Sequence, residues 1–274
     1  MVKRFLLGVI LFIYIIIFLF SACTHLTKKQ PHINHVQKME KILPKGSFLP
    51  YENFIYIEKD VYTNLLDKSF CMPFENSTNC QLTSYGTGSG IAISHKDNTV
   101  FFLTAHHVCK ESKEEMLSLF FQDEKGNYHY PYFKIKAHFY GKEYDARIIN
   151  YDFENDLCLL SLESEFAYKT RKVKIAKNSP QIGDPIYMMS APVSMYSDTT
   201  RFEFQGKFSG CNQFIYLNYD FCYFTIPSAP GSSGSGVFNE KGELISILSI
   251  SLAPFPEISA GSRKYFIENL LSRH

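Results

Sequence analysis

A hydroxyl flanked by glycines is the clearest candidate for chemistry in this sequence. Segment 230–236 reads PGSSGSG and stands directly before the apolar pair Val237 and Phe238. Glycines let the backbone turn sharply and bring its N–H groups close to a bound group, which residues with a β-carbon resist. A Gly-x-Ser-Gly loop can therefore supply a nucleophile and oxyanion donors together. Gly/Ser-rich segments are more often linkers or turns, so the weight of this loop depends on what lies upstream.

Two polar sites upstream complete a catalytic set. Segment 100–108 reads VFFLTAHHV, an apolar strand that ends in a pair of histidines, and in segment 155–162 (NDLCLLSL) Asp156 stands directly before an apolar strand. A histidine at a strand end is often only a half-buried hydrogen-bonding residue, and an aspartate before a strand is often a turn residue. Together with the serine loop, however, they provide a base, an orienting carboxylate and a nucleophile.

Short strands must position these groups. From about residue 50 the chain consists of short runs rich in Ile, Val, Phe, Tyr and Thr, separated by Gly, Asn, Asp and Pro, which is typical of an all-β protein. We expect about a dozen strands, near residues 90–94, 100–104, 117–122, 133–139, 146–149, 157–162, 185–189, 202–208, 214–218, 222–226, 236–238 and 244–250. Without a long internal helix, this pattern predicts a sandwich or paired barrels. Segment 261–272, with Phe266, Leu270 and Leu271 on one face, predicts a closing helix.

The first 23 residues predict export. Lys3 and Arg4 precede an uncharged apolar run over residues 5–20, which is typical of a signal peptide and just short of a membrane span. Residues 20–23 (FSAC) resemble the cleavage box of bacterial lipoproteins, although Phe20 replaces the usual leucine. We rank a lipoprotein with a lipidated Cys23 first, an uncleaved signal anchor second and plain secretion third. In each case the folded part lies outside the cytoplasm.

The polar segment 24–49 is interpreted as a tether between membrane and domain. Its three histidines are interpreted as solvated residues rather than metal ligands, because they are scattered over a segment without signals for the start or end of a helix or strand. These histidines are His25, His32 and His35.

The cysteine count agrees with export. Setting Cys23 aside leaves six of the seven cysteines, and an even number suits an oxidising compartment. Short separations favour Cys71 with Cys80 and Cys211 with Cys222, which leaves Cys109 with Cys158. Six cysteines allow about fifteen connectivities. An equal alternative is that several of these cysteines form no disulfide and are buried as small apolar residues.

Composition describes an ordinary globular protein with a sizeable core, since the chain is 45% hydrophobic and 16% aromatic with a net charge of +1. Lysines and arginines form no cluster outside the signal segment, so nucleic-acid binding has no electrostatic basis. The length of 274 residues fits one domain or two small lobes.

The three motifs, in this order, resemble those of the chymotrypsin/trypsin-like serine peptidases, and within them the HtrA-like bacterial branch. Segment 104–108 (TAHHV) resembles the Thr-Ala/Asn-x-His-Val box, which assigns the base to His107 rather than His106. Segment 155–160 (NDLCLL) is similar to the Asn/Ser-Asp-Ile-Ala-Leu-Leu strand start, which points to Asp156 over Asp152 and Glu154.

The serine loop carries the resemblance further. Segment 230–234 (PGSSG) matches the family's Pro-Gly-Asn-Ser-Gly loop and makes Ser233 the nucleophile, with the backbone N–H groups of Gly231 and Ser233 as the oxyanion hole. The resemblance covers about residue 86 to the C-terminus and implies two six-stranded β-barrels with the active site in the cleft between them. The triad mechanism that it implies requires no metal or organic cofactor. We therefore divide the chain into a protease domain over 50–274, with barrels at about 80–165 and 175–260 and a helix at 261–272.

The resemblance also locates the primary substrate pocket. Its residues are Pro227, Ser228, Ser249, Ile250 and Ser251. These residues belong to two segments, about 225–229 and 249–251, and neither contains a charged residue. A buried cation or anion without a partner is strongly disfavoured. The pocket therefore predicts cleavage after uncharged, small to medium side chains.

Four departures from the family pattern have consequences. Segment 235–236 (SG) replaces the usual Gly-Pro after the nucleophile, which alters the stiffness of the loop. Ser232 replaces an aspartate that captures a freed N-terminus, so activation by N-terminal cleavage is not expected. Cys109 lies two positions after His107 rather than one, so the family's usual disulfide there cannot be assumed. We expect no PDZ domain after the protease part, which disfavours a large peptide-regulated oligomer.

These motifs predict an exported serine endopeptidase acting on peptide or protein substrates. The main alternative is a catalytically inactive relative that serves as a binding or adhesion module on the cell envelope. It is disfavoured because all three triad positions are filled. A lipid-anchored β-rich structural protein is a more distant alternative.

Overall fold

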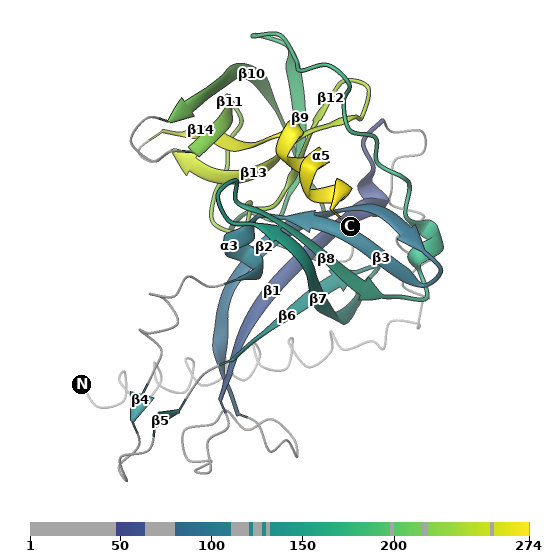
Figure 1. Ribbon diagram of the computed structural model, residues 1–274, viewed down its shortest axis with the longest axis vertical. Coiled ribbons are helices and arrows are strands. Elements are labelled where there is room, and N and C mark those ends of the chain that lie inside the picture. The colour runs from purple at the N-terminus through teal and green to yellow at the C-terminus, as the bar shows by residue number, and fades with distance from the viewer. Residues whose placement is uncertain are drawn as a thin grey trace, which may run out of the picture.

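Two closed antiparallel β-barrels make up the protein (Figure 1). The computed structural model describes residues 48–63, 80–110, 121–122, 128–129, 132–197, 200–214, 219–252 and 255–273. Each barrel has six strands, and a short helix lies near the C-terminus. This confirms the predicted all-β, chymotrypsin-like fold.

The first barrel has the strand order β1-β2-β3-β8-β7-β6. Its strands are β1 (Phe54–Thr63), β2 (Cys80–Lys96), β3 (Thr99–Thr104), β6 (Tyr132–Phe139), β7 (Lys142–Asp152) and β8 (Leu157–Glu163). Inward-facing side chains such as Ile57, Phe102, Phe139 and Leu160 form its core. Side chains alternate between the two faces of a strand, so every second residue of β3 and β6 reaches this core.

The second barrel has the order β10-β11-β14-β13-β12-β9. Its strands are β9 (Pro185–Ser190), β10 (Phe202–Phe214), β11 (Tyr219–Phe224), β12 (Gly236–Asn239), β13 (Leu244–Leu252) and β14 (Phe255–Arg263). The remaining elements are η1 (Tyr51–Asn53), α3 (His106–Cys109), β4 (Phe121–Gln122), β5 (Tyr128–His129), η3 (Ala167–Lys169), η4 (Pro192–Ser194) and α5 (Lys264–Ser272). Met188, Phe224 and Val237 belong to the core of this barrel.

A third apolar cluster joins the barrels. It contains Leu103 and Leu159 from the first barrel and Met189 and Phe238 from the second. Strand β8 is buried along both faces, because Leu160 points into the first barrel while Leu159 faces this shared cluster. Helix α5 lies between the barrels and inserts Ile267 and Leu270 into the same cluster (Figure 1). The two barrels are therefore held together by a continuous apolar interface, in which each buried Leu or Ile contributes about 1.5–3 kcal/mol.

Two barrel strands lie outside the strands expected from the sequence. Strand β1 begins the first barrel at Phe54, before the expected start near residue 80; its run of Glu58, Lys59 and Asp60 obscures the apolar alternation. Strand β14 is rich in small residues, and a β-carbon at Gly261 would lie 2.3 Å from the Ile247 carbonyl oxygen. Helix α5 accordingly starts only at Lys264. Of the expected strand 117–122, only residues 121–122 are described, as a strand outside both barrels.

Two of the three expected cysteine pairs are disulfide bonds: Cys211 with Cys222, expected from their short separation, and Cys109 with Cys158, expected by elimination. Cys71 and Cys23 lie outside the described residues, as do the export segment and most of the tether. Since disulfides persist in oxidising compartments, the two bonds indicate an extracytoplasmic location. Within the described part of the chain, no helix has the length and apolar character needed to cross a membrane.

Candidate active site

The His107 imidazole lies against the Asp156 carboxylate. Nδ1 of His107 is 2.9 Å from Oδ2 and 3.1 Å from Oδ1 of Asp156. The backbone N–H of His107 also donates to Oδ1, at 3.0 Å. The carboxylate therefore contacts both the ring and the backbone of the same residue. With Nδ1 bound in this way, Nε2 is the ring nitrogen left to exchange a proton.

A disulfide fixes the elements that carry this pair. Cys109 ends the four-residue helix α3 that holds His107, and Cys158 lies in β8, two residues after Asp156. Both cysteines are buried. Closing a loop of 49 residues constrains the unfolded chain by about 4 kcal/mol in the loop-entropy account. The same bond that stabilises the first barrel thus holds the histidine segment beside the aspartate segment.

The turn before β8 explains why Asp156 rather than Asp152 faces the histidine. Asp152 accepts hydrogen bonds from the backbone N–H and the side-chain amide of Asn155, at 3.1 and 3.0 Å. Its carboxylate is therefore used within the turn. Asp156 itself has φ +50, a left-handed conformation that Asp and Asn adopt more readily than most residues. Glu154 is exposed in the same turn.

His106 occupies a different environment from its neighbour. Its ring is buried and packs against Tyr151, at 5.2 Å between centroids, and Phe153, at 5.3 Å. Burial lowers the pKa of His106 and outweighs the opposing effect of the Asp156 charge. His106 is thus a buried packing residue, whereas the His107 side chain is half exposed.

The serine loop requires glycine at the positions that the sequence marks. Gly231 has φ +91 and Gly234 has φ +88, both in the left-handed region. A β-carbon at Gly231 would lie 2.5 Å from the Ala191 carbonyl oxygen, and one at Gly234 would lie 2.0 Å from the Ser89 carbonyl oxygen. Only a residue without a side chain fits either position. The glycines therefore let the loop pack directly against both barrels.

Ser89 links the serine loop to the first barrel. Its backbone N–H donates to the Ser233 carbonyl at 2.8 Å, and its hydroxyl donates to the Gly231 carbonyl at 2.9 Å. The Ser89 carbonyl in turn accepts from the Thr104 hydroxyl at 2.7 Å. A β-carbon at Gly88 would meet both the Val108 side chain, at 2.5 Å, and the Ser233 carbonyl, at 3.1 Å. Helix α3 and the serine loop therefore approach the same point of β2.

The Ser233 hydroxyl points to the second barrel. Oγ donates to the Ser249 carbonyl at 3.2 Å, and no hydrogen bond between Oγ and His107 exists among the described residues. Such contacts are often long in a free enzyme and form only with substrate. Within the described chain, the backbone N–H groups of Gly231 and Ser233 donate to no other residue. The loop therefore presents a hydroxyl and two N–H donors without strong competing partners.

A family model described as a trypsin-like peptidase domain matches residues 88–247, more than half of the chain. This chain belongs to the trypsin-like peptidase family. A search of curated protein sequences found no significant match.

Solved structures of proteases share the fold of this trypsin-like peptidase. The serine endoprotease from Yersinia pestis matches with a TM-score of 0.54 and 16% identity, over 84% of this chain and 67% of that one. The active form of the Rv3671c protease from M. tuberculosis matches with a TM-score of 0.55 and 12% identity, over 81% of each chain. Identities this low establish the similarity of fold, and the chemistry must be argued from the site itself.

The expected pocket residues of this peptidase lie on β13 and on the segment that precedes the serine loop. Ser249 is buried next to the Ser233 hydroxyl, and Ile250 and Ser251 follow it along β13. Pro227 and Ser228 precede the serine loop, and the Ser228 backbone N–H donates to the Pro256 carbonyl at 3.1 Å. The hydroxyls of Ser228 and Ser249 are shielded from solvent and have no hydrogen-bond partner among the described residues.

Two residues that support the site were not singled out from the sequence. Ser89 is flanked by two glycines, a signal that would have indicated close backbone approach. Lys59 is buried in β1, and its Nζ donates to the His107 carbonyl at 2.9 Å. Nothing in the local sequence of Lys59 indicates this contact, because it joins residues 48 positions apart across the barrel.

Proposed function

We propose that this trypsin-like peptidase is an exported serine endopeptidase that uses Ser233, His107 and Asp156. The observation that carries the proposal is the bidentate contact of Asp156 with His107, on an element packed beside the glycine-flanked Ser233. Loss of active-site labelling on removal of the Ser233 hydroxyl is the decisive test.

In the proposed reaction, the Ser233 hydroxyl turns away from the Ser249 carbonyl and gives its proton to His107 Nε2 while Oγ attacks the peptide carbonyl. Asp156 keeps the His107 Nδ1–H in place and stabilises the imidazolium that forms. The imidazolium then protonates the leaving amine. Water hydrolyses the resulting acyl-enzyme by the same proton transfers in reverse order.

The charge that develops on the carbonyl oxygen needs donors that are already in place. The N–H groups of Gly231 and Ser233 are proposed to supply them, because neither donates to another described residue. One such donor is worth about 3–4 kcal/mol of transition-state stabilisation. The left-handed φ of Gly231 orients the first of these peptide groups.

The rival proposal is an inactive binding module with the same barrels. It predicts no covalent reaction of Ser233, although substrate-like peptides would still bind. The contact between Asp156 and His107 favours the enzyme, because a binding surface has no need for a carboxylate that orients an imidazole.

We expect cleavage after uncharged, small to medium side chains. The two proposed pocket segments carry no charged residue, whereas Ser228 and Ser249 offer buried hydroxyls without partners. A charged substrate side chain would be desolvated there without a counterion, which is strongly unfavourable. A peptide-library profile at the position before the cut measures this preference. Dominance of Lys, Arg, Asp or Glu would show that other residues form the pocket.

The finer location is proposed from residues 20–23: the mature protein begins at a lipidated Cys23 and is anchored in the cell-envelope membrane. We expect Cys23→Ser to abolish incorporation of labelled fatty acid into the exported protein, while Cys71→Ser leaves incorporation unchanged. Unaltered labelling of the Cys23→Ser protein would rule out the lipoprotein assignment and favour a signal anchor or secretion.

A further inference from the structure

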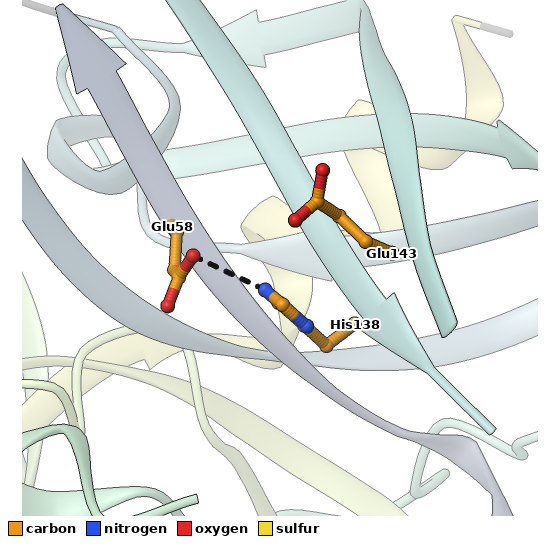
Figure 2. A group of neighbouring side chains, drawn as sticks. All are labelled: Glu58, His138 and Glu143. Carbon is orange, nitrogen blue, oxygen red and sulfur yellow. Dashed lines mark ion pairs between the residues drawn. The ribbon is translucent and has the colours of Figure 1, made fainter. Parts of the chain in front are cut away.

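Three side chains that can bind metal meet on the outer face of the first barrel, outside the candidate active site. Glu58 lies on β1, His138 on β6 and Glu143 on β7, and the two glutamates flank the imidazole (Figure 2). Their ligand atoms all lie within 4.8 Å of one another. No other group of three such side chains in the described part of the chain is this compact.

Strand register brings the three together. His138 stands directly opposite Tyr56 on β1 and directly opposite Glu143 on β7. Side chains alternate along a strand, so Glu58 shares the face of Tyr56 and lies diagonally across from His138. The opposite face of β1 carries Ile57 into the barrel core. The barrel is therefore a rigid support for a three-strand set of ligands.

The His138 ring is held in place with Nε2 turned toward Glu58, with which it forms an ion pair (Figure 2). Its centroid lies 5.4 Å from that of Tyr56 and 5.7 Å from that of Tyr196. Nε2 is shielded from solvent and lies 3.2 Å from Oε2 of Glu58, but without the geometry of a hydrogen bond. A cation bound between the imidazole and the carboxylate would give this shielded nitrogen the directed contact that the ion pair with Glu58 lacks.

An ion-pair network around Lys136 is the plainer explanation of the acidic groups. Lys136 Nζ lies 2.7 Å from Oε1 of Glu143 and 3.0 Å from Oδ1 of Asp145. Lys136 can, however, remain paired with Asp145 when Glu143 turns away. Lys136 does not pair with Glu58, whose basic partner in the described part of the chain is His138 rather than a lysine or arginine. The network therefore accounts for Glu143 but not for the contact between Glu58 and His138.

We propose that Glu58, His138 and Glu143 bind a Zn²⁺ ion. One imidazole and two carboxylates form a ligand set suited to Zn²⁺, whereas Ca²⁺ takes six to eight oxygen ligands and Mg²⁺ keeps most of its waters. Three protein ligands leave a fourth tetrahedral position for water. The ligand atoms must close to about 3.4 Å from one another for metal–ligand bonds of about 2.1 Å. The half-exposed Glu143 can make this movement by side-chain rotation. The serine mechanism does not use this ion.

The test is Zn²⁺ titration of the full chain, followed by calorimetry, with variants that isolate the site. Other histidines of the chain can also bind Zn²⁺. The measured quantity is therefore the difference in the number of bound Zn²⁺ ions, and in their affinity, between the wild-type protein and each variant. We expect the wild-type protein to bind one Zn²⁺ more than His138→Ala. Glu143 is half exposed, so Glu143→Gln should leave the fold intact. We expect this substitution to lower the Zn²⁺ affinity of the site at least about tenfold. His95→Ala, which removes an exposed histidine of β2, is the control and should retain the site.

A second readout separates binding from a folding defect. Zn²⁺ should raise the Tm of the wild-type and His95→Ala proteins by several degrees and that of Glu143→Gln by less, because ligand binding to the folded state adds to its stability. Equal stoichiometry and affinity in wild type, His138→Ala and Glu143→Gln would overturn the proposal. Loss of the site in His95→Ala, or displacement of Zn²⁺ by equimolar Ca²⁺, would overturn it as well.

Discussion

Ser233→Ala is expected to abolish both peptide hydrolysis and covalent labelling by a fluorophosphonate probe. Removing the nucleophile of a serine triad lowers kcat by a factor on the order of 10⁶, which leaves turnover below detection. The substitution deletes one hydrogen bond, to the Ser249 carbonyl, so the free energy of unfolding should change by no more than about 1.5 kcal/mol. Probe labelling followed by intact-mass measurement, beside a denaturant titration, records both quantities.

Ser235→Ala is the matched control for this experiment. Ser235 lies two residues further along the same loop, is buried, and has a hydroxyl without a hydrogen-bond partner among the described residues. Its removal should leave labelling intact. Stoichiometric labelling of Ser233→Ala would show that another residue is the nucleophile. The absence of labelling in the folded wild-type protein would instead favour the inactive binding module.

His107→Ala and His106→Ala are expected to have opposite effects, although the two residues are adjacent. His107→Ala removes the imidazole that Asp156 orients, and turnover should fall by a factor on the order of 10⁴ to 10⁶ with little loss of stability, because the side chain is half exposed. His106→Ala should keep a substantial fraction of turnover. It should lower the free energy of unfolding by about 2 kcal/mol or more, because a cavity replaces the ring between Tyr151 and Phe153.

Turnover measured below the unfolding temperature, together with denaturant titrations of both variants, distinguishes these effects. His106→Phe is a useful companion, because a phenyl ring can refill the space between the two aromatic side chains. If turnover were lost in His106→Ala and kept in His107→Ala, the assignment of the base would be off by one residue.

The candidate site depends on both barrels. The histidine and aspartate segments belong to the first barrel, where Cys109 and Cys158 connect them, and the serine loop belongs to the second. Ser89 joins the two halves through its bonds to the loop backbone. Helix α5 packs into the interface that keeps the barrels together. The relative position of Ser233 and His107 therefore depends on the packing between the barrels.

The amino-acid sequence alone determined the all-β class, the family and the candidate residues, because these depend on local patterns. Short alternating strands, glycines around Ser233 and a polar residue at the end of each relevant strand can be recognised without knowing which strands are neighbours. The short separation of Cys211 and Cys222 also favoured their pairing, and elimination left Cys109 with Cys158; both disulfides are present.

The tertiary structure decided what depends on strand register and barrel closure. The two adjacent histidines lie in different environments, because the His106 ring packs against aromatic side chains while the His107 ring contacts Asp156. Strand β1 joined the first barrel despite its charged residues, since closure pairs both of its edges. The cluster of Glu58, His138 and Glu143 has no sequence motif, because its first two members lie 80 positions apart and meet only through the pairing of β1 with β6. Contacts between distant strands are set by which side chains share a face, and no local pattern of residues records that.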